Sequence, residues 1–212
     1  MTAAPKAPKA KKKFPLVPVA FAIVALALIT VVVLTFDEGG SSGEIGSPEV
    51  TGEPLARLPE AGNDPAVGMS APLVTGADFD DNPVSIANDG NAKIILFLAH
   101  WCPHCQNEVP IVQDWLDGDP LVEGVDFYTV ATSISSTRDN YPPSAWLDRE
   151  GWTAQVIVDD GASSVAGAYG LSAFPFWAFT AADGTVLARL SGGISPNDLD
   201  GVVATLQAQA GG

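Results

Sequence analysis

Cysteine and histidine are scarce in this 212-residue chain, which contains two of each. All four lie within residues 100–105, "HWCPHC". Two cysteines exclude a framework of several disulfides. A tetrahedral zinc site would need all four side chains, which crowd one strand end and one helical turn and cannot easily surround a single ion. A purely structural Cys102–Cys105 disulfide would close too short a loop to stabilise the fold much. We therefore favour local thiol chemistry.

Basic residues are scarce beyond the N-terminus. Residues 1–36 contain five lysines and no acidic residue. The remainder contains 25 acidic residues against five basic ones, which gives it a net charge of −20. Nucleic-acid binding needs clustered lysine and arginine, so this balance argues against a nucleic-acid partner. An acidic surface that keeps the domain soluble is the simpler interpretation.

Charged residues are absent from residues 14–36, "FPLVPVAFAIVALALITVVVLTF". About 20 helical residues span a bilayer core of roughly 30 Å, so we predict a transmembrane anchor. A cleaved signal peptide is the alternative, because Ala25-Leu26-Ala27 matches a small-x-small cleavage site. The lysine-rich residues 1–13 would stay in the cytoplasm. We therefore expect a single-pass cell-membrane protein whose C-terminal domain is extracytoplasmic, where disulfides persist.

The rest of the chain divides into a linker and a globular domain. Residues 37–63 are rich in Gly, Ser, Pro and Glu, which predicts a flexible acidic linker. From residue 64 to 212, strand and helix patterns alternate and predict an α/β fold around a mixed sheet. We expect strands at residues 93–99, 125–132, 155–158, 176–180 and 185–190, and helices after residue 102, around 143–150, at 162–169 and from Pro196.

The spacing of the two cysteines favours redox chemistry. A helix that starts at Cys102 places its sulfur at the positive end of the helix dipole, which stabilises a thiolate. Cys105 lies one helical turn later on the same face, so it can attack a mixed disulfide formed at Cys102. This arrangement predicts thiol–disulfide exchange with protein thiols.

Two segments resemble membrane-tethered, extracytoplasmic thioredoxin-like oxidoreductases of the TlpA/ResA type: "GMSAPLVTGADF…KIILFLAHWCPHCQNEVP" and "YGLSAFPFWAFTAADGTVLARLSG". The resemblance covers about residues 66–210 and rests on Gly68, Ala71-Pro72, Trp101-Cys102-x-x-Cys105 and Pro110. It implies a thioredoxin fold and no cofactor. It also implies that Pro175 is the cis-proline that lies against the disulfide and helps bind partner chains.

Three positions bear on how such a site would work. Leu96 stands where thioredoxins have a buried Asp that assists proton transfer at the second cysteine. Glu108 could do some of that work, or could be an ordinary exposed helical residue. The Pro103-His104 dipeptide resembles that of the oxidising DsbA type, and His104 can stabilise the Cys102 thiolate. Phe174 precedes Pro175, a position where neither thioredoxins nor proteins of the DsbA type usually have an aromatic residue. We expect Phe174 to line the partner-binding edge.

The remaining histidine and the tryptophans receive simpler interpretations. His100 could tune the thiolate or bind a partner, but we favour a solvent-facing residue at the strand end. Trp101, beside Cys102, is expected to shield the site and contact partners. The other four tryptophans are expected to pack in the core: Trp115, Trp146, Trp152 and Trp177.

The sequence leaves the direction of electron flow open. His104 favours donation of the Cys102–Cys105 disulfide to folding proteins, whereas the TlpA-like organisation favours reduction, for example of apocytochrome c cysteines. A reductase would also need electrons from a membrane redox partner. A copper chaperone of thioredoxin fold and a redox-inert binding domain are further alternatives. No histidine follows position 104, which disfavours the copper site.

Overall fold

The structure, a computed structural model, describes residues 44–210. The predicted cytoplasmic segment 1–13 and anchor 14–36 lie outside the described residues. Among the helices of residues 44–210, none combines the length and apolar character needed to cross a membrane.

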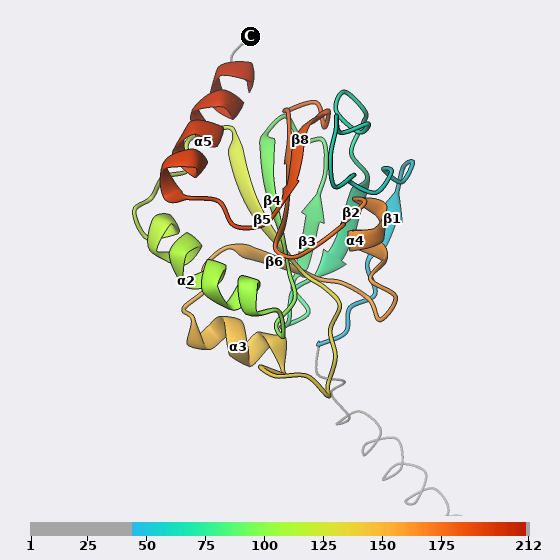
Figure 1. Ribbon diagram of the computed structural model, residues 1–212, viewed down its shortest axis with the longest axis vertical. Coiled ribbons are helices and arrows are strands. Elements are labelled where there is room, and N and C mark those ends of the chain that lie inside the picture. Colours follow the sequence, from blue (N-terminus) through green and yellow to red (C-terminus); the bar gives the residue numbers. More distant parts are fainter. Residues whose placement is uncertain (1–43, 211–212) are drawn as a thin grey trace, which may run out of the picture. The chain divides into compact units, whose positions relative to one another are not determined.

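A five-stranded mixed sheet forms the centre of the domain, in the order β6-β5-β4-β7-β8 (Figure 1). Strands β4, β5 and β6 are parallel, and β7 and β8 run antiparallel to their neighbours. Every residue of β4 is buried, as predicted for a central strand covered on both faces. The strand bounds are β4 Ala92–Leu98, β5 Val125–Ala131, β6 Gln155–Val158, β7 Phe176–Thr180 and β8 Val186–Ser191.

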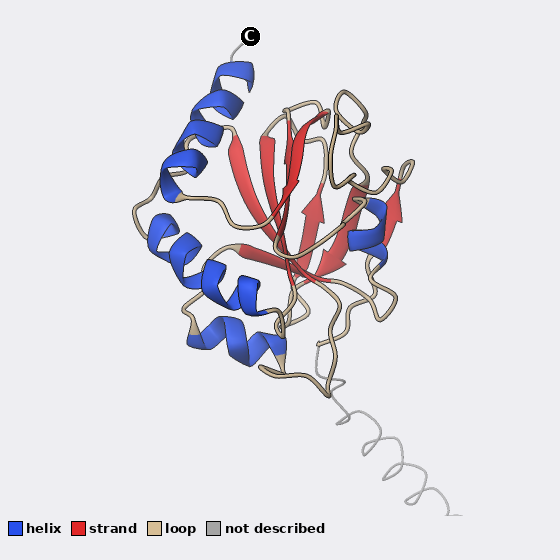
Figure 2. Cartoon of the chain, in the orientation of Figure 1, coloured by secondary structure: helices blue, strands red, loops and turns tan. Residues whose placement is uncertain are grey.

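Helices cover both faces of this sheet (Figure 2). Three of them lie on one face: α2 Pro103–Leu116, α3 Pro143–Arg149 and α5 Pro196–Ala210. The short helix α4, Ser164–Ala168, lies on the other. Successive side chains of β4 point to opposite faces of the sheet and pack into two separate cores. Leu96 packs in the core under α2 and α5, and Phe97 packs in the core under α4. These layers confirm the predicted α/β fold.

A second, three-stranded antiparallel sheet was not expected from the sequence. It has the order β1-β2-β3, with β1 Glu49–Thr51, β2 Leu73–Ala77 and β3 Pro83–Ile86. Val74 of β2 and Ile86 of β3 are buried in the α4-side core. These strands are short and their alternation of apolar and polar residues is weak, which is why periodicity did not predict them.

The prediction of a flexible linker over residues 37–63 is wrong for residues 44–63. The Gly46 amide donates to the Asp159 carbonyl at 2.9 Å, and the buried Leu55 donates its amide to Ala168 at 2.8 Å. The Glu44 carboxylate caps helix α3, accepting from the Ser144 hydroxyl and from its amide at 3.3 Å. A few apolar and polar anchors therefore order a segment whose composition alone predicts disorder.

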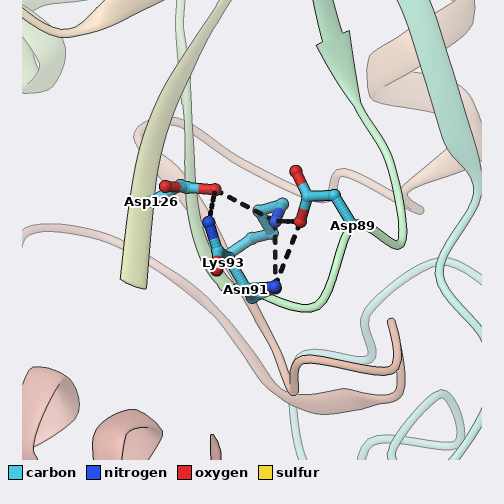
Figure 3. A network of polar contacts seen from close by, with 4 residues as sticks. All are labelled: Asp89, Asn91, Lys93 and Asp126. Carbon is cyan, nitrogen blue, oxygen red and sulfur yellow. Dashed lines mark hydrogen bonds and ion pairs between the residues drawn. The ribbon is translucent and has the colours of Figure 1, made fainter. Parts of the chain in front are cut away.

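A buried lysine lies at the amino ends of β4 and β5, away from the cysteines (Figure 3). The Lys93 ammonium contacts the Asp89 carboxylate, the Asn91 carbonyl at 2.9 Å and the Asp126 carboxylate at 3.1 Å. Lys93 and Asp126 are also register partners across the two strands. The network neutralises the buried charge and fixes the β4–β5 pairing, a structural role.

Candidate active site at the carboxyl end of β4

The fold places Cys102 at the start of helix α2. Strand β4 ends at Leu98, the chain turns through three residues, and Cys102 is the N-cap with φ −80° and ψ 119°. Its amide donates to the Ala99 carbonyl at 2.9 Å, and its carbonyl accepts from the Gln106 amide at 3.0 Å. No side chain caps this helix end. The Cys102 sulfur therefore lies where helix amide groups stabilise negative charge.

The two cysteines differ in exposure. Cys102 is 7 % exposed and Cys105 is 0 % exposed, beneath it on the first turn of α2. Burial raises the pKa of the Cys105 thiol well above its ordinary value, and the nearby Cys102 and Glu108 add to this effect. Only Cys102 can meet a partner's sulfur directly. This asymmetry agrees with Cys102 as the first and Cys105 as the second participant in exchange.

Glu108 is buried rather than exposed, so the interpretation as an ordinary surface glutamate is wrong. It is 6 % exposed, and its Oε1 accepts a hydrogen bond from the Ile194 amide at 2.7 Å. Burial raises the pKa of this carboxyl, and the Ile194 hydrogen bond partly opposes the rise. Gly193 allows this approach, since a Cβ there would lie 2.4 Å from Glu108 Oε2. Helix α2 thus carries a buried acid one turn after Cys105.

Trp101 and Phe174 meet beside the cysteine motif. Their ring centroids are 6.0 Å apart at 82°, an edge-to-face contact. The Trp101 indole N–H donates to the Ser133 carbonyl at 2.8 Å. The Phe174–Pro175 peptide bond is cis, and Pro175 is buried. The structure therefore brings the loop before β7 to the cysteine motif, where the partner-binding edge was predicted.

His100 is 1 % exposed, so the prediction of a solvent-facing side chain is wrong. Its Nε2 accepts from the Ser135 amide at 3.2 Å, which leaves the proton on Nδ1 to donate to the Asp139 carbonyl at 2.7 Å. Burial lowers the pKa of this imidazole. His100 therefore holds the β5–α3 connection against the end of β4. No residue pattern indicated these contacts, because both partners are backbone groups more than 30 residues away.

Arg138 lies in the same β5–α3 connection and was not identified from the sequence as a residue of the site. Its guanidinium carbon lies 4.2 Å from the centroid of the Trp101 ring. The side chain is exposed, and only its position in the segment inserted between two strands could have drawn attention to it. His104 is also exposed, on the first turn of α2. Leu96, which stands where thioredoxins have a buried Asp, is buried in the core and cannot transfer a proton.

The predicted packing role of the other tryptophans is confirmed. Trp115, Trp146 and Trp177 are buried in the core on the α2 and α5 side, and Trp152 packs against that core. The indole N–H of Trp152 donates to Thr129 at 3.0 Å. Within residues 44–210, no three His, Cys, Asp or Glu side chains are grouped closely enough to hold a metal ion.

Comparison with known proteins supports the resemblance seen in the sequence. The family described as "Thioredoxin-like domain" matches residues 79–207, more than half of the chain. StoA from Bacillus subtilis aligns over 65 % of this chain and 98 % of its own, with 21 % identity and a TM-score of 0.54. A secreted Mycobacterium tuberculosis disulfide oxidoreductase aligns over 62 % and 95 %, with 21 % identity and a TM-score of 0.52.

A thiol:disulfide interchange protein from Chlorobium tepidum aligns over 69 % of this chain and 99 % of its own. The identity is 24 % and the TM-score is 0.55. These likenesses confirm a thioredoxin-like α/β fold.

Proposed function

We propose, on the premise that this chain belongs to the thioredoxin-like domain family, that it is a thiol–disulfide oxidoreductase acting on protein partners. One observation carries the proposal: Cys102, which keeps 7 % of its surface exposed, occupies the N-cap of α2, and the fully buried Cys105 lies one turn below it. A purely structural pair would not need one sulfur at a helix N-terminus.

The reaction is a two-step exchange. In the oxidising direction, a substrate thiolate attacks Cys102 of the Cys102–Cys105 disulfide and releases the Cys105 thiolate, which takes up a proton. A second substrate thiolate then attacks the substrate sulfur of the mixed disulfide and releases the Cys102 thiolate. The substrate dithiol loses two electrons to the protein and releases two protons, one of which Cys105 takes up. In the reducing direction, the Cys102 thiolate attacks first and Cys105 completes the release.

We assign roles to the neighbouring residues on this scheme. Glu108 exchanges the proton of the buried Cys105, because it is the buried carboxyl one turn further along α2. His104 stabilises the Cys102 thiolate from the first turn of the helix. Trp101, Phe174 and Pro175 form the edge that receives the partner chain, since they bring aromatic surface and a chain segment to the motif.

We favour net oxidation of substrate dithiols. The support is chemical: a group that stabilises the Cys102 thiolate stabilises the reduced protein, which makes its disulfide a stronger oxidant. Reduction of disulfides, as in cytochrome c maturation, is the alternative, and it would require a membrane redox partner that resupplies electrons. We place the domain outside the cytoplasm, tethered by residues 14–36, because these residues lack charge and follow a lysine-rich segment.

The test is stoichiometric. The oxidised full-length chain in detergent is mixed with an equimolar reduced dithiol peptide, and free thiols are counted on both molecules. We expect loss of both peptide thiols and appearance of thiols on Cys102 and Cys105. A Cys102→Ser variant should oxidise none of the peptide. Unchanged peptide with the wild-type disulfide would contradict the proposed activity.

A further inference from the structure

We propose that Arg138 determines the specificity of this site by selecting protein partners that carry a carboxylate side chain next to the reacting cysteine. The inference rests on the proposed function and names the class of partner that the site accepts.

The position of Arg138 places it at the site. Its guanidinium lies over the ring of Trp101, the residue that precedes Cys102, at 4.2 Å from the ring centroid. Trp101 is held in turn by the Ser133 carbonyl and by the edge of Phe174. A guanidinium stacked on an aromatic face keeps the N–H groups along its edge free to bind another molecule. A chain lying along the Trp101–Phe174 edge would therefore meet these donors.

The fold fixes the backbone that carries Arg138. The Arg138 amide donates to the Ser135 carbonyl at 3.2 Å. The buried His100 ring binds the Ser135 amide through one nitrogen and the Asp139 carbonyl through the other. Residues on both sides of Arg138 are thus tied to the end of β4, directly before the cysteine motif. These hydrogen bonds therefore hold the backbone of Arg138 in a fixed position beside the cysteine motif.

Arg138 also differs from the other cations of residues 44–210 in having no acceptor. Lys93 and Arg189 form ion pairs with aspartates. Arg57 donates to the Ser172 carbonyl, and Arg149 donates to Asn140 and to the Ala145 carbonyl. The exposed Arg138 side chain makes no hydrogen bond or ion pair with any residue in this range.

These features favour a carboxylate as the group recognised. Planar guanidinium donors match a carboxylate in bidentate geometry, and the Trp101 ring shields one side of the pair from water. The domain is otherwise strongly acidic, so its overall field repels an acidic partner, while Arg138 supplies a local positive charge beside the cysteine motif. A single acidic residue beside the partner's cysteine would satisfy Arg138, whereas an extensively acidic surface would be repelled.

The experiment uses the oxidised full-length chain in detergent and three reduced peptides. The peptides differ only in the residues flanking one cysteine, which are Glu, Gln or Lys. The rate of mixed-disulfide formation with each is divided by that peptide's rate with a small aromatic disulfide, which removes differences in intrinsic thiol reactivity. We expect the Glu peptide to react roughly fivefold faster than the Gln peptide, the factor that about 1 kcal/mol supplies.

Variants separate the local contact from the charge of the domain. Arg138→Ala should abolish the Glu-over-Gln preference, and Arg138→Glu should shift the preference to the Lys peptide. Arg149→Ala removes the same charge from an exposed arginine that does not contact Trp101, and it should keep the preference.

Three results would overturn the inference. The first is a Glu preference that survives Arg138→Ala, and the second is equal rates for the Glu and Gln peptides with the wild-type protein. The third is a preference of the wild-type protein for the Lys peptide, which would show that the acidic field of the whole domain selects the partner. In all three cases exchange proceeds and the proposed activity stands. Absence of exchange with every peptide would overturn the proposed function and this inference with it.

Discussion

Glu108 Oε1 accepts a hydrogen bond from the Ile194 amide at 2.7 Å, which joins helix α2 to the segment that precedes α5. The contact holds a carboxyl group in the core, one turn after Cys105, and burial raises its pKa. The two groups also influence each other, since Glu108 contributes to the raised pKa of Cys105. Negative charge on one opposes negative charge on the other, and on the proposed role Glu108 takes up the proton that Cys105 loses.

Glu108→Gln should slow the step in which Cys105 attacks a mixed disulfide at Cys102, by about two orders of magnitude. The amide cannot take the thiol proton, while the first attack by Cys102 does not require it. Rapid acid quenching of single turnovers, with the mixed disulfide quantified by mass spectrometry, separates the two steps.

Asp114→Asn, which neutralises an exposed carboxyl on the same helix, is the matched control. In this variant Cys105 should resolve the mixed disulfide at the wild-type rate. In the wild type, release should accelerate as the pH rises through the elevated pKa of Glu108, because the ionised carboxylate is the base. Unchanged release in the Gln variant would exclude proton transfer by Glu108.

His104→Thr should make the potential of the Cys102–Cys105 couple more reducing. On the proposed role, the imidazole stabilises the thiolate of the reduced protein and has no comparable effect on the disulfide. If it contributes about 1.4 kcal/mol, the shift is roughly 30 mV for this two-electron couple. Equilibration with glutathione measures it, with Asn107→Thr as a control at another exposed position of α2. An unchanged potential would remove the chemical support for an oxidising role.

The stability of the domain should decrease as the pH falls below about 6.5, the ordinary pKa of histidine. Burial lowers the pKa of His100 in the folded state, so between the lowered and the ordinary value only the unfolded chain binds the proton. The unfolded state then binds more protons, and the free energy of unfolding falls with decreasing pH by up to about 1.4 kcal/mol per unit.

Several charged or titratable groups surround His100. Glu44 favours its protonated form, Arg138 disfavours it, and Tyr141 lies edge-to-face at 6.0 Å. Denaturant titrations between pH 5 and 7 should give a smaller pH slope for His100→Gln than for the wild type. Asn107→Gln, which changes an exposed side chain of α2 that has no titratable group, should keep the wild-type slope. Equal slopes in all three proteins would show that His100 does not titrate in this range.

Helices and strands that follow from the local pattern of apolar, capping and proline residues were predicted correctly from the sequence. The apolar run at residues 93–99 became the buried strand β4, and Ser195 and Pro196 marked the start of α5, where the Asp198 amide donates to the Ser195 hydroxyl at 3.2 Å. The expectation that Cys105 is the more buried of the two cysteines also agrees with the structure, in which Cys105 is 0 % and Cys102 is 7 % exposed.

Residues whose structure depends on distant backbone groups were not predicted. His100 is buried by the carbonyl of Asp139 and the amide of Ser135, and Glu108 by the amide of Ile194. Backbone donors and acceptors are present at every position, so no residue pattern marks them. The segment at residues 44–63 was missed for the same reason, because its order comes largely from backbone hydrogen bonds to Asp159, Ala168 and Gly170.

Membrane attachment through residues 14–36 should survive washing of membranes with alkaline carbonate. The uncleaved apolar segment would stay in the bilayer, and protease added from the outside should degrade the C-terminal domain. Immunoblotting of the membrane and soluble fractions follows both. A soluble extracytoplasmic chain beginning near Thr30 would instead establish a cleaved signal peptide.

The capture of substrates by single-cysteine variants tests the proposed thiol–disulfide exchange most directly. In the reduced Cys105→Ser variant, Cys102 can attack a substrate disulfide, but no internal thiolate can release the product. We therefore predict that mixed disulfides accumulate, seen as reductant-sensitive bands on non-reducing gels. Cys102→Ser should trap little, because Cys105 is buried and its raised pKa keeps it protonated. Equal trapping by the two variants, or none by Cys105→Ser, would contradict the account.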